Sequence, residues 1–155
     1  AARVDIMASA AHHRPDATID GLLIEKMAPQ GGVELMIGVT RDPVFGHVMT
    51  FGMGGIYVEI LRDVTRRMLP IGAEDAAAMV REMRCFPLLD GARGRPRADL
   101  NALEALLLQV SAFVVANADR IEEMDLNPVW LGAEGEGALP LDAVIIERAA
   151  SGASA

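Results

Sequence analysis

Cysteine is nearly absent from this chain of 155 residues, in which Cys85 is the single example. One thiol cannot form an internal disulfide, and it cannot supply the several sulfur ligands of a cysteine-based zinc cluster. A lone cysteine most often packs as a small apolar side chain. We therefore interpret Cys85 as a core residue rather than a catalytic nucleophile.

Long apolar runs and basic residues are also scarce. No apolar run approaches the roughly 20 residues of a membrane span, and the chain does not open with a basic segment followed by an apolar one. We therefore expect no membrane contact and a cytoplasmic location. The 14 Lys and Arg residues face 22 Asp and Glu residues, a net charge of −8. General nucleic-acid binding needs a basic face, so this class is excluded, although a small anion could bind through local arginines or a metal.

Apolar residues make up 52% of the chain, enough for one globular domain with a substantial core. Residues 2–13 have helical spacing and end before Pro15, and Asp99 is a plausible helix cap after a turn-rich segment. The periodicity predicts an α+β fold with a mostly antiparallel sheet, in which the breaker-rich 29–32 joins the first two strands as a hairpin. The expected strands are 21–28, 33–41, 47–51, 121–131 and 138–146, and the expected covering helices are 73–84 and 99–117.

A glycine cluster, "FGMGG", contains Gly52, Gly54 and Gly55. Such a cluster forms an ordinary tight turn, or it lets backbone amides approach a phosphate closely. It matches neither the Rossmann nor the Walker pattern. A turn is the favoured interpretation, and the ligand role stays open.

The stretch "MDLNPVWLGAEGEGALPLDAVII" reads as two apolar strands around a glycine-rich loop, yet it carries Asp125, Asn127 and Asp142. Because side chains alternate along a strand, Asp125 and Asn127 point the same way. If the hairpin is symmetric about its loop, position 127 lies opposite position 142. Two carboxylates and an amide are ligands that Mg²⁺ accepts, whereas the alternative is a turn at Asn127 with both acids solvated. Pro140 indicates that the second strand is an edge strand or is bulged there.

Several separated motifs resemble one known family when taken in order: "GLLIEKMAPQGGVELMIGVTRDPVFGHVMTFGMGGIYVEILRDV", "FPLLDGARGRP", "MDLNPV" and "LPLDAVI". They are similar to the ATP-grasp region of ADP-forming acyl-CoA synthetases, also called ADP-forming acetate–CoA ligases. The resemblance covers about residues 15 to 147, and the succinyl-CoA synthetase beta subunit is a more distant relative. It implies that residues 21–148 form the large ATP-grasp lobe. Residues 1–20 would then end a small lobe and its linker, and 149–155 would form a disordered tail.

The resemblance also implies a ligand for the acidic cluster. In the family, the hinge strand that matches "LLIEKM" lies near the adenine of ATP or ADP, which makes Glu25, Lys26 and Met27 candidate nucleotide-binding residues. Glu34 matches an acid near the ribose. Asn127 and Asp142 match the Mg²⁺ ligands, and Asp125 stands in place of the acid that commonly precedes them.

The family's reaction couples acid, CoA and ATP to acyl-CoA, ADP and phosphate, through an acyl phosphate and a phosphohistidine. The implied partner is a CoA-binding domain that carries this histidine, and a homo-oligomer is possible. His12, His13 and His47 match no such motif. The small lobe and its phosphate-binding lysine are not found ahead of the hinge, so we expect the chain to be an inactive C-terminal fragment of a longer enzyme.

Two arginines are candidates for the phosphoryl-transfer chemistry, because positioned cations stabilise phosphate charge. Arg41 follows a strand, and Arg95 lies in the loop "GARGRP". Two other functions stay open: a regulatory ATP-grasp module fused to a protein acetyltransferase, and a non-catalytic binding or assembly module with a solvated acidic face.

Overall fold

The computed structural model describes residues 2–54 and 63–148, except for the side chains of Ala2 and Arg93. Gly55 and the tail at 149–155, on which two predictions rest, lie outside the described residues. The helices are α1 (Ala2–His13), α3 (Ala73–Arg81), α4 (Phe86–Leu89), the 3-10 turn η1 (Ala92–Gly94) and α5 (Leu100–Ala116). The strands are β1 (Val33–Asp42), β2 (Gly46–Met53), β3 (Val64–Met68), β4 (Ile121–Leu131), β5 (Ala138–Pro140) and β6 (Ala143–Glu147).

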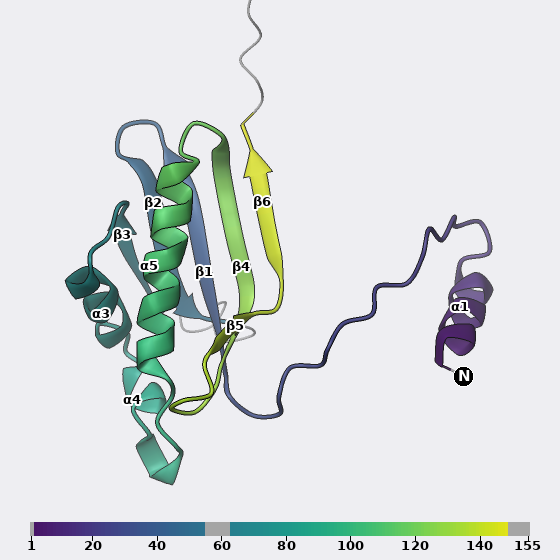
Figure 1. Cartoon of the computed structure of the whole chain (residues 1–155), viewed down its shortest axis with the longest axis horizontal. Helices are drawn as coiled ribbons and strands as arrows, with labels where there is room; N and C mark the ends of the chain where they lie inside the picture. The colour runs from purple at the N-terminus through teal and green to yellow at the C-terminus, as the bar shows by residue number, and fades with distance from the viewer. Residues whose placement is uncertain (1, 55–62, 149–155) are drawn as a thin grey trace, which may run out of the picture.

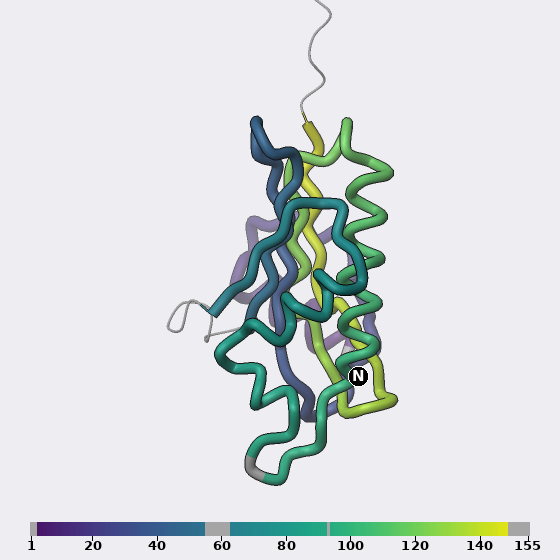
Figure 2. Tube along the Cα trace, turned by 90° about the vertical axis from the view of Figure 1, so that its left-hand side faces the viewer, coloured from purple at the N-terminus to yellow at the C-terminus, as the bar shows by residue number. Residues whose placement is uncertain are grey.

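The strands form one antiparallel sheet in the order β3-β2-β1-β4-β5, and β6 also pairs with β4. Helix α5 runs along one face of this sheet (Figure 1). The view from the side shows α5 on one side of the strands (Figure 2). The predicted α+β class with a mostly antiparallel sheet is therefore confirmed. None of the helices in the described parts of the chain is long and apolar enough to cross a membrane.

The core lies between the sheet and its helices. Alternate residues of β1 are buried, as a half-buried strand requires, and Leu35, Ile37 and Val39 are at most 1% exposed. Helix α5 contributes Leu103 and Leu107 from the turns that face them, both fully buried. Each such side chain contributes about 1.5–3 kcal/mol through burial. Within residues 2–54 and 63–148, no helix covers the opposite face of β1 and β4 (Figures 1 and 2).

The predicted helix at 73–84 ends earlier than expected, at Arg81. The backbone amides of Arg84 and Cys85 donate to the carboxylate of Asp63, at 2.9 and 2.8 Å, which diverts the chain away from further helical bonding. Cys85 is 9% exposed, and burial followed by the Asp63 carboxylate raises the pKa of its thiol to about 12. The interpretation of Cys85 as a core residue is confirmed, and the raised pKa disfavours the thiolate, which is the reactive form.

Asp99 is the N-cap of α5, as predicted. Its carboxylate accepts a hydrogen bond from the Ala102 amide at 3.0 Å. It also accepts bonds from the amides of Gly135 and Gly137, at 2.9 and 3.0 Å, in the loop between β4 and β5. These three bonds, with the Ala102 amide first, lower the pKa of Asp99. One side chain therefore fixes the last hairpin against the helix layer.

The predicted strand at 21–28, and its hairpin with 33–41, are wrong. Residues 17–29 adopt no helix or strand, and Leu23, Ile24 and Met27 are at least 84% exposed. Strand β1 already pairs with β2 on one side and β4 on the other, so it has no free edge for this segment. The segment instead leads away from the sheet to α1 (Figure 1).

Two further strand assignments change. Strand β3 was not expected from the sequence, and it extends the sheet beyond β2. The single strand predicted at 138–146 is divided into β5 and β6 by a break at residues 141–142. The break follows Pro140, where the sequence indicated an irregularity.

Candidate functional site

A bulge in β4 sets the orientation of its polar residues. Between the buried Leu126 and Val129, β4 has two residues, whereas β1 has only Met36 between the paired Leu35 and Ile37. These two β4 residues are Asn127 and Pro128, joined by a cis peptide, so β4 has one residue more than β1 at this point. Asp125 and Asn127 are exposed, while Met124 and Leu126 are buried against the helices. Both polar side chains therefore lie on the open face.

The predicted register of the last hairpin is confirmed on both sides of its break. Val129 pairs with Pro140, and Leu126 pairs with Ala143. The amide of Leu141 donates to the carbonyl of Pro128 at 2.9 Å, so the chains stay in step across the gap. This register places Asn127 opposite Asp142.

Asp142 is close enough to Asp125 to influence the ionisation of the Asp125 carboxyl. The Asp125 side chain is exposed, but partial desolvation by its surroundings raises the pKa of its carboxyl, and the negative charge of Asp142 raises it further. Like charges in such a position repel, and a bound cation would relieve that repulsion. Across residues 2–54 and 63–148, no three His, Cys, Asp or Glu residues gather into a metal-binding group. Any cation here would therefore have two carboxylates and an amide, and water or a ligand would complete its coordination.

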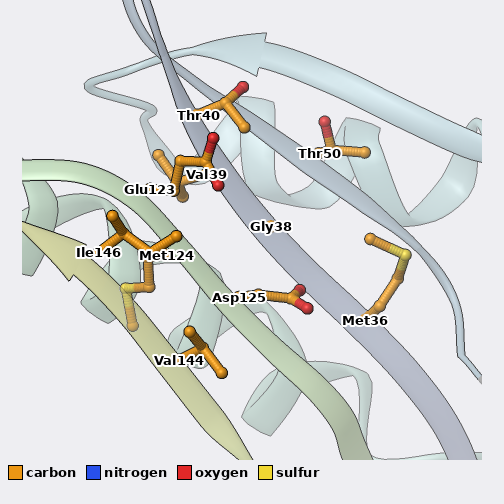
Figure 3. Close-up of a pocket in the computed structure, with 10 residues that line it drawn as sticks. All are labelled: Met36, Gly38, Val39, Thr40, Thr50, Glu123, Met124, Asp125, Val144 and Ile146. Atoms are coloured by element: carbon orange, nitrogen blue, oxygen red, sulfur yellow. The ribbon is translucent and has the colours of Figure 1, made fainter.

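Asp125 lines a shallow hollow of about 300 Å³ on the open face. Figure 3 shows its carboxylate directed across Gly38 of β1, which has no side chain to fill this space. Thr40 and Thr50 bring hydroxyl groups to the hollow, and Glu123 brings a second carboxylate. The polar groups of the hollow thus come from β1, β2 and β4, and Val144 and Ile146 of β6 give it an apolar border.

The segment before β1 borders a second hollow, of about 290 Å³, at the β5 end of the sheet. Lys26 and Met27 line it together with Trp130 and Leu139. The indole Nε1 of Trp130 donates to the carbonyl of Gly31 at 2.7 Å, which holds this segment against β4. Gly32 has a φ of 79° and packs under the indole, so a side chain there would be strained.

Glu34 and Glu25 complete the predicted nucleotide-binding set. Glu34 pairs with Trp130 in the β1–β4 register and is exposed, so it lies near this second hollow. Glu25 is also exposed but does not line the hollow. Lys26 and Met27 therefore line the second hollow, and Glu34 is linked to it only through its strand partner Trp130.

The two candidate arginines lie away from the hollow that Asp125 lines. Arg41 pairs with His47 near the β1–β2 turn. Strand alternation places Arg41 on the same side of the sheet as the helix-facing residues of β1. Arg95 lines a different hollow, of about 470 Å³, with Gly132 and Glu136. Neither arginine borders the hollow of Asp125.

The histidines also have separate positions. His47 is 7% exposed, and its Nε2 donates to the carbonyl of Ile121 at 2.8 Å. His12 and His13 are exposed at the end of α1. Sequence reasoning missed Thr40, Thr50 and Glu123 as residues of the open face. Period-two alternation could have found Glu123, which precedes Asp125 by two positions.

A family model described as an ATP-grasp domain matches residues 1–146. The chain belongs to the ATP-grasp domain family. It is 51% identical over 142 residues to the acetate–CoA ligase (ADP-forming) II subunit beta of Pyrococcus furiosus, covering 92% of this chain and 60% of that subunit. The chain therefore spans about 60% of the length of this curated relative.

Solved structures agree with this assignment. A crystal structure of a protein from Pyrococcus horikoshii has a TM-score of 0.81 and 47% identity, covering 94% of this chain and 60% of that one. Acetyl-coenzyme A synthetase 1 of Korarchaeum cryptofilum has a TM-score of 0.72 and 43% identity, covering 78% of this chain and 55% of that one. That protein was solved with coenzyme A and Mg-AMPPCP, and its phosphohistidine segment points towards the nucleotide-binding site. The resemblance to ADP-forming acyl-CoA synthetases is thus confirmed.

Proposed function

We propose that this chain is the nucleotide- and Mg²⁺-binding lobe of a longer ADP-forming acyl-CoA synthetase. In that enzyme it would support phosphoryl transfer between ATP or ADP and a phosphohistidine on a CoA-binding domain. The observation that carries the proposal is the register that places Asn127 opposite Asp142, with Asp125 on the same open face. The curated relative is a ligase, which favours a synthetase over an acetyltransferase fusion.

The acidic cluster fits Mg²⁺ in its chemistry and its charge. Asn127 and Asp142 would supply an amide oxygen and a carboxylate oxygen, and Asp125 would supply a second carboxylate nearby. A bound Mg²⁺ neutralises charge on nucleotide phosphates during phosphoryl transfer. The exposed position of all three side chains leaves room for phosphate oxygens beside them. The charge of Asp142 raises the pKa of Asp125, and a bound cation would relieve the repulsion between the two carboxylates.

The positions of the other predicted residues give the nucleotide a direction on the sheet. We propose that the base lies in the hollow of Lys26 and Met27, with the ribose near Glu34 at the start of β1. The phosphates would then extend along β4 towards Asp125, which pairs with Gly38 in the middle of β1. Arg41 and Arg95 lie outside this path, so we propose no catalytic step for them within this lobe.

Beyond the phosphates, the hollow of Asp125, Thr40 and Glu123 remains open. We propose that it admits the phosphohistidine segment of the CoA-binding domain. Its two hydroxyl-bearing residues and two carboxylates could orient an imidazole through hydrogen bonds. We also propose a cytoplasmic enzyme, in keeping with its soluble substrates.

The pH dependence of Mg²⁺ affinity tests this proposal. The pKa of Asp125 is raised above the ordinary 3.8, so protons should compete with Mg²⁺ at a higher pH than an ordinary carboxylate allows. Mg²⁺ affinity should fall as pH decreases through this raised pKa. Asp125→Asn should weaken Mg²⁺ binding roughly tenfold at neutral pH and reduce the pH dependence. Calorimetric titration of the chain at several pH values measures both effects.

The raised pKa of Asp125 also affects the stability of the folded chain. Because the pKa of Asp125 is higher in the folded chain than in the unfolded chain, the folded chain binds more protons at this carboxyl. The free energy of unfolding therefore decreases as pH rises above the ordinary value of 3.8 through the raised pKa. Asp125→Asn should therefore leave the metal-free fold as stable as before or slightly more stable at neutral pH. Glu134→Gln, an exposed change in the β4–β5 loop, is the matched control and should alter neither property. Equal Mg²⁺ affinity in Asp125→Asn and in the control would refute the metal site.

A further inference from the structure

Strand β6 forms an edge of the sheet with an exposed apolar surface. Among residues 2–54 and 63–148 its only strand partner is β4. Val144, Ile145 and Ile146 are 52%, 46% and 46% exposed, although they are consecutive and point to both faces of the sheet. No helix covers this edge in Figure 1. Edge strands are usually protected by lysine, proline or a bulge, and β6 (Ala143–Glu147) contains neither lysine nor proline.

The hydrogen-bonding groups of β6 fit a further antiparallel strand. The amide of Arg148 donates to the carbonyl of Arg120 at 2.8 Å, on the β4 side. Because these groups alternate along a strand, the amides of Ala143, Ile145 and Glu147 point outward. A second β6 aligned on Ile145 would meet them with the same set of groups.

The side chains are self-complementary in that alignment. Val144 and Ile146 lie on the open face of β6, and Asp142 and Arg148, which directly precede and follow this strand, continue the same two-residue spacing. In an antiparallel pair centred on Ile145, each Val144 faces Ile146 of the second copy, and each Asp142 faces Arg148 of the second copy. Opposite-charge and apolar cross-strand pairs both stabilise a sheet, whereas like charges opposite each other destabilise it.

The charges of Asp142 and Arg148 also favour pairing between two copies of β6. Asp142 lies near the like-charged Asp125 and would gain an opposite charge. Arg148 contacts Glu122 of its own chain only at 3.6 Å, with both side chains about 40% exposed (39% and 43%). Such an exposed ion pair contributes little, so Arg148 can turn to a stronger partner at little cost.

We propose that β6 pairs with β6 of a second copy of this chain, so that two sheets join into one across a two-fold axis. The occupant of this edge is the chain itself, because the row from Asp142 to Arg148 complements its own reverse. Such a contact is isologous and closes as a dimer. It brings Arg148 of the second copy beside Asp142, next to the proposed metal site, but it does not depend on that site.

Sedimentation velocity of the 155-residue chain tests the pairing through mass alone. The wild-type chain should sediment as a species of twice the 16.5 kDa chain mass. Asp142→Arg and Arg148→Asp each place two like-charge pairs across the seam, and each should weaken the dimer by roughly tenfold or more. Phe45→Asp, at the exposed tip between β1 and β2, is the control that removes an apolar side chain elsewhere and should keep the dimer.

Mixing the two weakened variants gives the sharpest test. Asp142→Arg and Arg148→Asp restore both opposite-charge pairs when one chain of each kind meets the other, so the mixture should regain the dimer. Circular dichroism should show that each variant is folded, since both side chains are exposed. A wild-type chain that stays monomeric, single variants that dimerise like the wild type, or a mixture that fails to recover the dimer would overturn the proposal. Because the readout is mass, a failure of the proposed Mg²⁺ site would leave these outcomes unchanged.

Discussion

The 155-residue chain, incubated with ATP, Mg²⁺, acetate and coenzyme A, is expected to form no measurable acetyl-CoA. The described residues supply one wall of the proposed site, the open face that carries Asp125 and Asn127. Phosphoryl transfer depends on positioned groups around the phosphates, and one open wall leaves them in contact with water. The chain also corresponds to only 60% of the Pyrococcus furiosus subunit.

A graft provides the positive control for this expectation. Replacing the matching region of the Pyrococcus furiosus subunit with this lobe, and adding the remaining subunit of that ligase, should restore acetyl-CoA formation. The 51% identity makes the lobe a reasonable structural replacement. Turnover by the chain alone would show that the catalytic parts lie elsewhere than we propose, and a folded but inactive graft would argue against its role as this lobe.

In the active graft, Asp142→Asn and Asn127→Leu should each reduce Mg²⁺-dependent phosphoryl transfer by at least about a hundredfold, as loss of one transition-state charge contact does. Both side chains are exposed, so neither change empties core volume and the thermal unfolding midpoint should barely move. Transfer of labelled phosphate from ATP to the partner histidine measures the effect. Glu134→Gln is the matched control and should transfer phosphate at the unmodified rate.

A particular pattern of losses would contradict the assignment. If both variants kept the rate of the control, the acidic cluster would be only a solvated face. If both lost activity together with their cooperative unfolding, the loss would be structural. A metal site formed by Asn127 and Asp142 requires that phosphate transfer be lost while the fold is retained.

Much of the fold could be predicted because burial imposes a period on the sequence. Leu35, Ile37 and Val39 alternate as a half-buried strand does, and the apolar stripe of α5 repeats every three or four residues. The segment at 21–28 has an equally apolar composition, yet a strand also needs a free edge to pair with. Both edges of β1 were already occupied, and composition carries no information on that competition.

In the site, too, the features that depend on neighbouring residues could be predicted, and those that depend on distant strands could not. The placement of Asn127 opposite Asp142 follows from counting residues on either side of one short loop, and the structure confirms the register on both sides of the break at 141–142. The bulge at Asn127 and Pro128 depends on how many residues β1 has between its own core positions, which local counting cannot give. Thr40 and Thr50 come from strands distant in sequence, so only the assembled sheet brings them to Asp125.

Replacing Mg²⁺ with Mn²⁺ would locate the bound cation on the sheet, because paramagnetic Mn²⁺ broadens the amide resonances nearest to it. In the 155-residue chain, the amides of Asp125, Asn127 and Ala143 should broaden at the lowest Mn²⁺ concentrations, while those of Arg41 and Arg95 stay sharp. Asp142→Asn should remove this selective broadening. Broadening that begins at any other acidic surface, or that is the same in Asp142→Asn, would show that the cation does not bind between Asn127 and Asp142.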